Sequence, residues 1–219
     1  MFRDTNPIFE FRGPWGVPVQ IGASLFLLIL VFVDFGGTPR DFAFDMMFVA
    51  ILIGSIYLHE LGHAWGCLIQ GVPVRRVMLY GGGGFCEQSR SSTRYEQELI
   101  VAMGPIVNAF LWAVSGLIAP FIADPEINWV FRTIAWVNGF LFILNMLPVH
   151  PLDGGKLFEL LLHRFLPSGV AITISASLGL VLAILWIPLM AWTFMTIGVV
   201  LFFLPSVRLH WQMLRGARA

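Results

Sequence analysis

Long apolar segments dominate the chain. A transmembrane helix needs about 20 mostly apolar residues, and segments of about that length occur at residues 17–33, 45–71, 99–123, 128–147, 168–187 and 188–204. The last two form one apolar block, which we divide at Pro188 because proline lacks an amide donor and favours a helix break. The pattern predicts an all-α polytopic membrane protein with about six transmembrane helices.

One polar segment has a different pattern. Residues 72–89 alternate apolar and polar side chains and include four consecutive glycines at 81–84. The alternation predicts strands and the glycines predict a turn. We therefore expect a small β-ribbon on the cytosolic side, with a flexible linker as the alternative.

Composition excludes several classes of protein. Hydrophobic residues make up 58% of the chain and charged residues only 12%, whereas a soluble domain carries about 25% charged residues. An ordinary soluble enzyme and a disordered chain are both excluded. The net charge is zero, so we expect neither nucleic acid nor nucleotide as a partner. The two cysteines, Cys67 and Cys86, form no disulfide framework.

The basic residues predict an orientation, because cytoplasmic loops are enriched in Lys and Arg. With a cytosolic N-terminus and six spans, only Arg40 and Arg132 of the 13 basic residues fall outside. Both termini are then cytosolic, in a bacterial or archaeal cell membrane. We expect one transmembrane domain over residues 1–205, with its core at 42–160, and a short cytosolic tail at 206–219.

The second apolar segment contains the sequence His59-Glu60-Leu61-Gly62-His63. Histidines four residues apart share one helix face, so both rings can bind one metal ion. The adjacent Glu60 is then placed as general base for a metal-bound water. Ionisable groups are costly inside a membrane and occur where they face a metal or a wet cavity. The alternative is a buried polar cluster that joins helices.

A catalytic zinc site normally has a third protein ligand. Cys67 lies about 12 Å from His59 along the helix axis, which favours a packing role. By residue type, the other candidates are His150, His163, His210 and Asp153.

Asp153 is favoured by its neighbours in the sequence. Pro148 and Pro151 end the fourth apolar segment, and two glycines follow Asp153. Broken backbone at membrane depth is tolerated where it lines protein or a water-filled cavity. The sequence therefore predicts a re-entrant Pro/Gly loop that carries Asp153 to a polar site.

The HELGH sequence and the later NMLPVHPLDGG sequence at 145–155 together resemble the site-2 protease family of intramembrane zinc metalloproteases. The stretch GPIVN at 104–108 is similar to a further family signature. The resemblance covers residues 55–160, and no PDZ insertion or CBS module is apparent. It implies one Zn²⁺ held by His59, His63 and Asp153, with Glu60 as catalytic base.

The resemblance also implies an activity and a role for Asn145. The expected activity is zinc-dependent endoproteolysis of membrane-spanning or membrane-proximal segments in membrane-tethered proteins, within the lipid bilayer. Asn145 would orient the substrate or stabilise the oxyanion. His150 stands where family members often have an apolar residue, and it or Cys67 could tune the site. No particular oligomeric state is indicated.

A helical substrate must be unwound before its carbonyl groups can be attacked, because helical hydrogen bonds occupy them. We expect the ribbon at 72–80 to hold an extended substrate by strand addition at Val74 and Val77, with further contacts at Gly82 and Asn108. Proline at Val74 or Val77 should then reduce cleavage without removing zinc. Asn108 could instead be an interhelical hydrogen-bond partner.

Two other functions are compatible with intramembrane histidines. A metal transporter would need a polar path to the far side, and the outer halves of the apolar segments disfavour one. An inactive membrane scaffold is disfavoured by the intact Glu60.

Overall fold

The computed structural model describes residues 7–197 and 205–217, without the side chains of residues 194 and 197. The chain forms two compact units, Met1–Phe142 and Ile143–Ala219.

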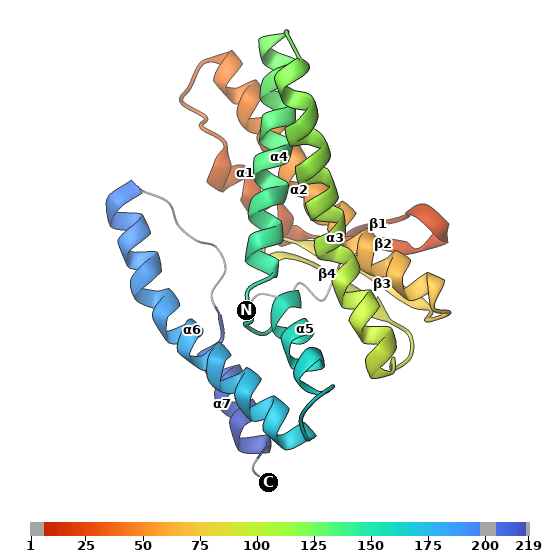
Figure 1. Ribbon diagram of the computed structural model, residues 1–219. Coiled ribbons are helices and arrows are strands. Elements are labelled where there is room, and N and C mark those ends of the chain that lie inside the picture. The colour runs from red at the N-terminus through yellow and green to blue at the C-terminus, as the bar shows by residue number, and fades with distance from the viewer. Residues whose placement is uncertain (1–6, 198–204, 218–219) are drawn as a thin grey trace. The chain divides into compact units, whose positions relative to one another are not determined.

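The first unit contains a four-stranded sheet of strand order β1-β2-β3-β4 (Figure 1). Its strands are β1 (Pro7–Arg12), β2 (Pro18–Gly22), β3 (Val74–Tyr80) and β4 (Gly83–Gln88). The β1–β2 and β3–β4 pairs are antiparallel, and β2 pairs in parallel with β3. The predicted ribbon is therefore confirmed as the β3–β4 hairpin, and it belongs to a larger sheet than the sequence indicated.

The prediction of a transmembrane helix at residues 17–33 is wrong. Residues 17–33 form β2, the 3-10 turn η2 (Ala23–Phe26) and the short helix α1 (Leu27–Phe32). Pro18 and Gly22 disfavour a continuous helix, and the helical part Ala23–Phe32 is only about 15 Å long. That length does not cross a hydrocarbon core of about 30 Å.

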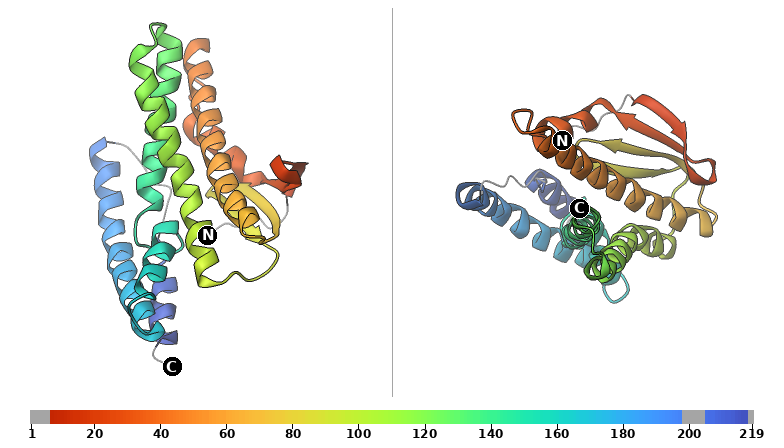
Figure 2. Two further views of the ribbon diagram at one scale, coloured as in Figure 1. Left: turned by 45° about the vertical axis from the view of Figure 1, so that its right-hand side comes forward. Right: turned by 90° about the horizontal axis from the view of Figure 1, so that it is seen from above.

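Three long helices begin in the first unit: α2 (Pro39–Ile69), α3 (Arg94–Ile118) and α4 (Pro125–Asn145), whose last residues from Ile143 on belong to the second unit. The turn η3 (Ala119–Phe121) follows α3. Capping boxes begin both α2, at Thr38 and Asp41, and α3, at Thr93 and Glu96. The sheet lies on one side of α2 and α3 lies on another (Figure 2).

Close packing places α3 directly against the HELGH segment of α2. A Cβ atom at Gly62 would lie 2.7 Å from the carbonyl oxygen of Met103, and one at Gly66 would lie 3.0 Å from Ile100 Cα. Glycine at both positions lets the two helix backbones approach, as small residues do in membrane helix pairs. An apolar core that includes Val19, Val49 and Val77 lies between α2 and the sheet.

The second unit contains α5 (Asp153–Leu162), α6 (Ser168–Ile197) and α7 (Val207–Gly216), and α7 packs against α6 (Figure 1). The predicted division at Pro188 is wrong, because α6 continues through this residue. Membrane helices tolerate proline where local adjustments satisfy the released backbone groups. The remainder of the sixth predicted segment, residues 198–204, lies outside the described residues.

Within the described residues, four helices are long and apolar enough to cross a membrane, at Pro39–Ile69, Arg94–Phe121, Pro125–Asn145 and Ser168–Thr193. The all-α prediction therefore holds for the spans, whereas their expected number of six does not.

Candidate metal centre

The HELGH residues form the candidate site on α2. His59, Glu60 and His63 are all buried, with 6%, 5% and 8% of their surfaces exposed. The Nε2 atoms of the two imidazoles lie 3.1 Å apart. One potential ligand atom from each of the three residues lies within 4.8 Å of the other two. Two nitrogens on one tetrahedral zinc ion would be about 3.4 Å apart. The imidazole pair therefore fits a shared zinc ion.

Each imidazole is oriented by a hydrogen bond on its other nitrogen. His63 Nδ1 donates to the carbonyl oxygen of Ile100 over 2.8 Å, and His59 Nδ1 donates to Asn108 Oδ1 over 2.5 Å. A proton on Nδ1 leaves the lone pair of Nε2 available for a metal ion. Both acceptors lie on α3, so the packing of α3 against α2 selects the ligand tautomer of both rings.

Asn108 connects His59 to a polar chain across three helices. Asn108 Nδ2 donates to Asn138 Oδ1 over 2.7 Å, and Asn138 Nδ2 donates to Ser55 Oγ over 2.9 Å. Asn108 and Asn138 are both fully buried. These contacts favour an orienting role for Asn108 over the predicted contact with substrate. Sequence reasoning missed Asn138 and Ser55, although polar residues in apolar helices are a recognisable signal.

Gly104 provides the space for the imidazole pair. A Cβ atom at this position would lie 2.4 Å from His63 Nε2 and 2.7 Å from His59 Nε2. Any larger residue would displace the rings that Ile100 and Asn108 of α3 hold in place.

Glu60 lies against β4. A Cβ atom at Gly84 would be 2.5 Å from Glu60 Cγ and 2.9 Å from Glu60 Oε1. One edge of β4 pairs with β3, and in the described sheet the other edge carries no strand. An edge strand therefore passes directly beside the candidate general base.

The residues predicted to hold substrate, Val74, Val77 and Gly82, lie on β3 or in the turn that follows it. Along residues 77–79, β3 pairs with β2 on one side and with β4 on the other, so this part of the strand has no free edge. Val77 is fully buried in the core and Val74 packs against it. Gly82 lies in the turn between β3 and β4, and a Cβ atom there would be 2.8 Å from the Tyr80 ring. Val77 therefore has no free strand edge for a substrate, whereas the pairing with β2 does not reach Val74, and substrate contact at Val74 and Gly82 stays a prediction.

Cys67 has a packing role, as expected. It is fully buried in a cluster with Val72 and Ile100. The Cys86 thiol on β4 also packs against this cluster. Its hydrogen bond to Cys67 and its burial raise the pKa of Cys86 well above the usual range.

The remaining predicted residues lie in the second unit. Asn145 is the last residue of α4 and Asp153 is the first of α5. A Cβ atom at Gly154 would be 2.3 Å from the carbonyl carbon of Met146, and one at Gly155 would be 2.7 Å from the His150 nitrogen. The prolines and glycines therefore end α4 and pack the start of α5 against the intervening turn.

Two further candidate ligands, His150 and His163, associate with Glu159 of α5. His150 Nε2 lies 3.2 Å from Glu159 Oε2, and Lys156 Nζ lies 3.2 Å from Glu159 Oε1. His163 Nε2 is 3.8 Å from Oε1 of the same carboxylate. The hydrogen bond from His150 and the positive charge of Lys156 lower the pKa of Glu159 to about 2. Sequence reasoning did not identify this carboxylate.

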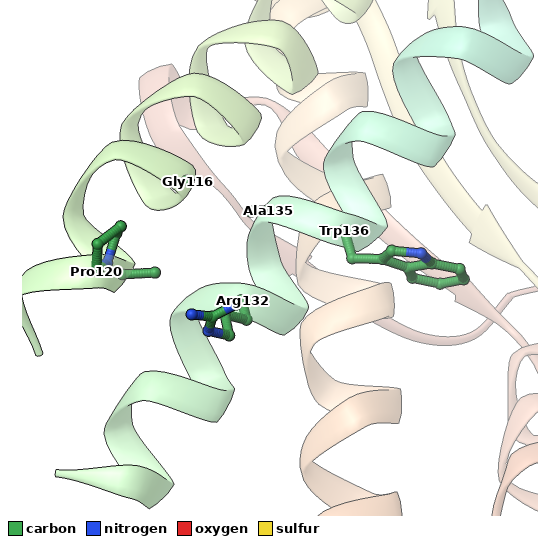
Figure 3. A pocket seen from close by; sticks show the side chains of 6 residues that line it. Gly116, Pro120, Arg132, Ala135 and Trp136 are labelled. Carbon is green, nitrogen blue, oxygen red and sulfur yellow. The ribbon is translucent and has the colours of Figure 1, made fainter. Parts of the chain in front are cut away.

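A separate hollow lies between the end of α3, with the turn η3 that follows it, and the middle of α4 (Figure 3). Its lining residues are Gly116, Ala119, Pro120, Arg132, Ala135 and Trp136. None of these six carries an imidazole, thiol or carboxylate, so the hollow offers no metal ligand of these types.

Comparison with known proteins decides the family. The model of peptidase family M50 matches residues 47–124 and 114–186, which include both the HELGH segment and the turn that carries Asp153. The chain belongs to peptidase family M50. With its four long apolar helices, this M50 chain is a membrane protein.

Relatives of this M50 chain include two curated proteins. A zinc metalloprotease of Methanocaldococcus jannaschii is 25% identical over 172 residues, which cover 78% of this chain and 50% of the relative. A putative zinc metalloprotease of Synechocystis is 26% identical over 159 residues, covering 66% and 41%. This M50 chain thus spans about half, or less, of the length of these relatives.

A solved structure shows the same fold. The site-2 protease from Methanocaldococcus jannaschii superposes with a TM-score of 0.62 at 20% identity, over 96% of this M50 chain and 93% of that one.

Proposed function

We propose that this M50 chain is a zinc-dependent intramembrane endopeptidase. The observation that carries the proposal is the pair of buried Nε2 atoms 3.1 Å apart, next to Glu60, on a helix long enough to cross a membrane. The description of two relatives as zinc metalloproteases supports it. The metal-transporter and inactive-scaffold alternatives gain no support from the relatives.

Three residues are proposed as zinc ligands. His59 and His63 provide the imidazoles, and Asp153, at the end of the NMLPVHPLDGG segment, provides a carboxylate. When bound, the zinc ion would polarise the scissile carbonyl group and lower the pKa of a bound water molecule.

The side chains around the ion would carry out the proton transfers. Glu60 accepts a proton from the attacking water and passes it to the leaving amine. Asn145 donates a side-chain N–H to the oxygen on which negative charge develops. Ile100 and Asn108 keep the two imidazoles in the ligand tautomer throughout.

An extended substrate segment is proposed to add to β4 rather than to β3. The outer edge of β4 is unpaired in the described sheet, and Gly84 of this strand packs against Glu60. Strand addition there would unwind a substrate helix and bring a peptide bond beside the base. The proposed substrates are membrane-tethered proteins cut within or near their membrane-spanning segments.

The orientation also remains a proposal, with both termini and the active site toward the cytosol. The parallel pairing of β2 with β3 places the N-terminal strands on the same side as the Arg75–Arg76 segment. Basic residues favour the cytosolic side. Within the second unit, α7 packs beside the first half of α6, near Gly169 and Gly179, which supports a C-terminus on the side where α6 begins.

The test is Glu60→Gln in the full chain, co-expressed with candidate single-pass substrates. We expect the purified variant to keep one zinc ion per chain while cleavage falls by about 10²-fold or more, because the base is lost and the ligands remain. Glu126→Gln, the same substitution at an exposed residue, should leave zinc content and cleavage unchanged. Cleavage by Glu60→Gln at the wild-type rate, or wild-type protein without zinc, would overturn the proposal.

A further inference from the structure

A fully buried histidine on the last helix contacts the turn that precedes Asp153. His210 belongs to α7, where it and Leu214 are the buried residues. An imidazole without exposed surface is costly unless its nitrogens are hydrogen-bonded. The partners of His210 therefore indicate what the residue does.

Both nitrogens of His210 are hydrogen-bonded. Nδ1 donates to the carbonyl oxygen of Ser206, the N-cap residue of α7, over 2.8 Å. Nε2 accepts the backbone N–H of His150 over 3.1 Å. Burial lowers the pKa of His210, more than its bond to Ser206 raises it, and this keeps Nε2 available as an acceptor.

Gly179 of α6 makes the space for this contact. A Cβ atom at Gly179 would lie 2.3 Å from both Cδ2 and Nε2 of His210. Glycine is unfavourable inside a helix relative to alanine, and here its absent side chain admits the imidazole ring to the turn.

His210 is one of several groups that contact His150. The His150 ring pairs with Glu159 over 3.2 Å, and Gly155 allows α5 to pack against the His150 backbone nitrogen. The bond from His210 acts on the same N–H group, three residues before Asp153.

We propose that His210 is a positioning residue, through which α7 fixes the turn at residues 146–152 and hence the carboxylate of Asp153. This inference rests on the proposed function only in assigning Asp153 as a zinc ligand. It gives the C-terminal helix a role in metal binding although α7 itself supplies no ligand.

The experiment compares four variants of the full chain: His210→Ala, His210→Gln, Gly179→Ala and Gly169→Ala. His210→Ala removes the acceptor of the His150 N–H, and His210→Gln keeps an acceptor near the position of Nε2. Gly179→Ala fills the space of the imidazole. Gly169→Ala is the matched control on α6, since its Cβ atom would meet only Ala217 O at 3.5 Å.

Two quantities are measured besides cleavage: amide hydrogen exchange of the peptide covering residues 146–153, and the rate of zinc release to a chelator. We expect His210→Ala and Gly179→Ala to raise both, with zinc released about tenfold faster, the scale of supporting interactions at metal sites. Gly169→Ala should match the wild type, and His210→Gln should recover most of the protection of the turn.

The outcomes that overturn the inference are distinct from those that overturn the proposed function. Wild-type exchange and zinc release in His210→Ala would show that His210 only packs α7 against α6. Faster exchange throughout α6 and α7, with no recovery in His210→Gln, would show a general structural role. A wild-type protein that holds no zinc would instead contradict the proposed function, and hydrogen exchange would still test the bond between His210 and the turn.

Discussion

Single residues determine whether the two imidazoles can share an ion. His59 and His63 provide the nitrogens, but Asn108 and Ile100 select their tautomers. Gly104 provides the space in which both rings fit. A metal centre of this kind therefore depends on groups that never touch the ion, because ligand orientation is set by outer hydrogen bonds.

Gly104→Ala should remove the metal while the protein stays folded. Alanine favours a helix over glycine by about 1 kcal/mol, but its Cβ atom would lie 2.4 Å from His63 Nε2 and must displace the ring. We expect zinc content, measured on purified protein, to fall at least tenfold. Gly116→Ala on the same helix meets only Ala135 Cβ at 3.9 Å and serves as control. Full zinc occupancy in Gly104→Ala would show that the rings tolerate displacement.

At the scale of elements, the packing of β4 against α2 places a strand beside the candidate base. The contact exists because Gly84 has no side chain where Glu60 lies. The hairpin itself follows from local alternation and glycines, whereas its position over Glu60 depends on the packing of the sheet against α2.

Gly84→Ala should impair catalysis with the metal retained. The new Cβ atom would lie 2.5 Å from Glu60 Cγ, so the flexible Glu60 side chain must move while His59 and His63 keep their partners. A displacement of about 1 Å can cost about 10²-fold in rate. Cleavage assays should show reduced kcat at normal zinc content, the opposite pattern to Gly104→Ala. Loss of zinc in Gly84→Ala would indicate that β4 also supports the ligands.

At the scale of the whole molecule, a bound metal stabilises the folded chain through linkage, because the ion binds the folded state. At free zinc one hundred times the dissociation constant, the gain is about 2.7 kcal/mol. The proposed ligands lie on α2 and at the start of α5, so the response to chelator tests the ligand set.

Removal of zinc should lower the thermal unfolding midpoint of the wild-type protein in detergent. Asp153→Asn should show a smaller difference between zinc-loaded and chelator-treated samples, because one proposed ligand is weakened. The midpoints can be followed by intrinsic tryptophan fluorescence. An unchanged response in Asp153→Asn would exclude Asp153 as a ligand.

Local features of the sequence predicted much of this protein. The spacing of HELGH placed His59 and His63 on one helix face, and Pro148 correctly predicted an end of helix before the Asp153 turn. Alternation and glycines predicted the β3–β4 hairpin. Each depends on residues within a few positions of one another, and chain geometry alone relates such residues.

Contacts between distant residues were decided by the tertiary structure. Hydrophobicity shows that residues 17–33 avoid water, but their first part is a strand because it pairs with β1 and with β3, which lies more than 50 residues later. In the same way, Asn108 orients His59 because Asn138 and Ser55 lie beside it in the bundle. Hydrogen-bond partners across helices leave no spacing signal in the sequence, so their identity becomes visible only once the helices are packed.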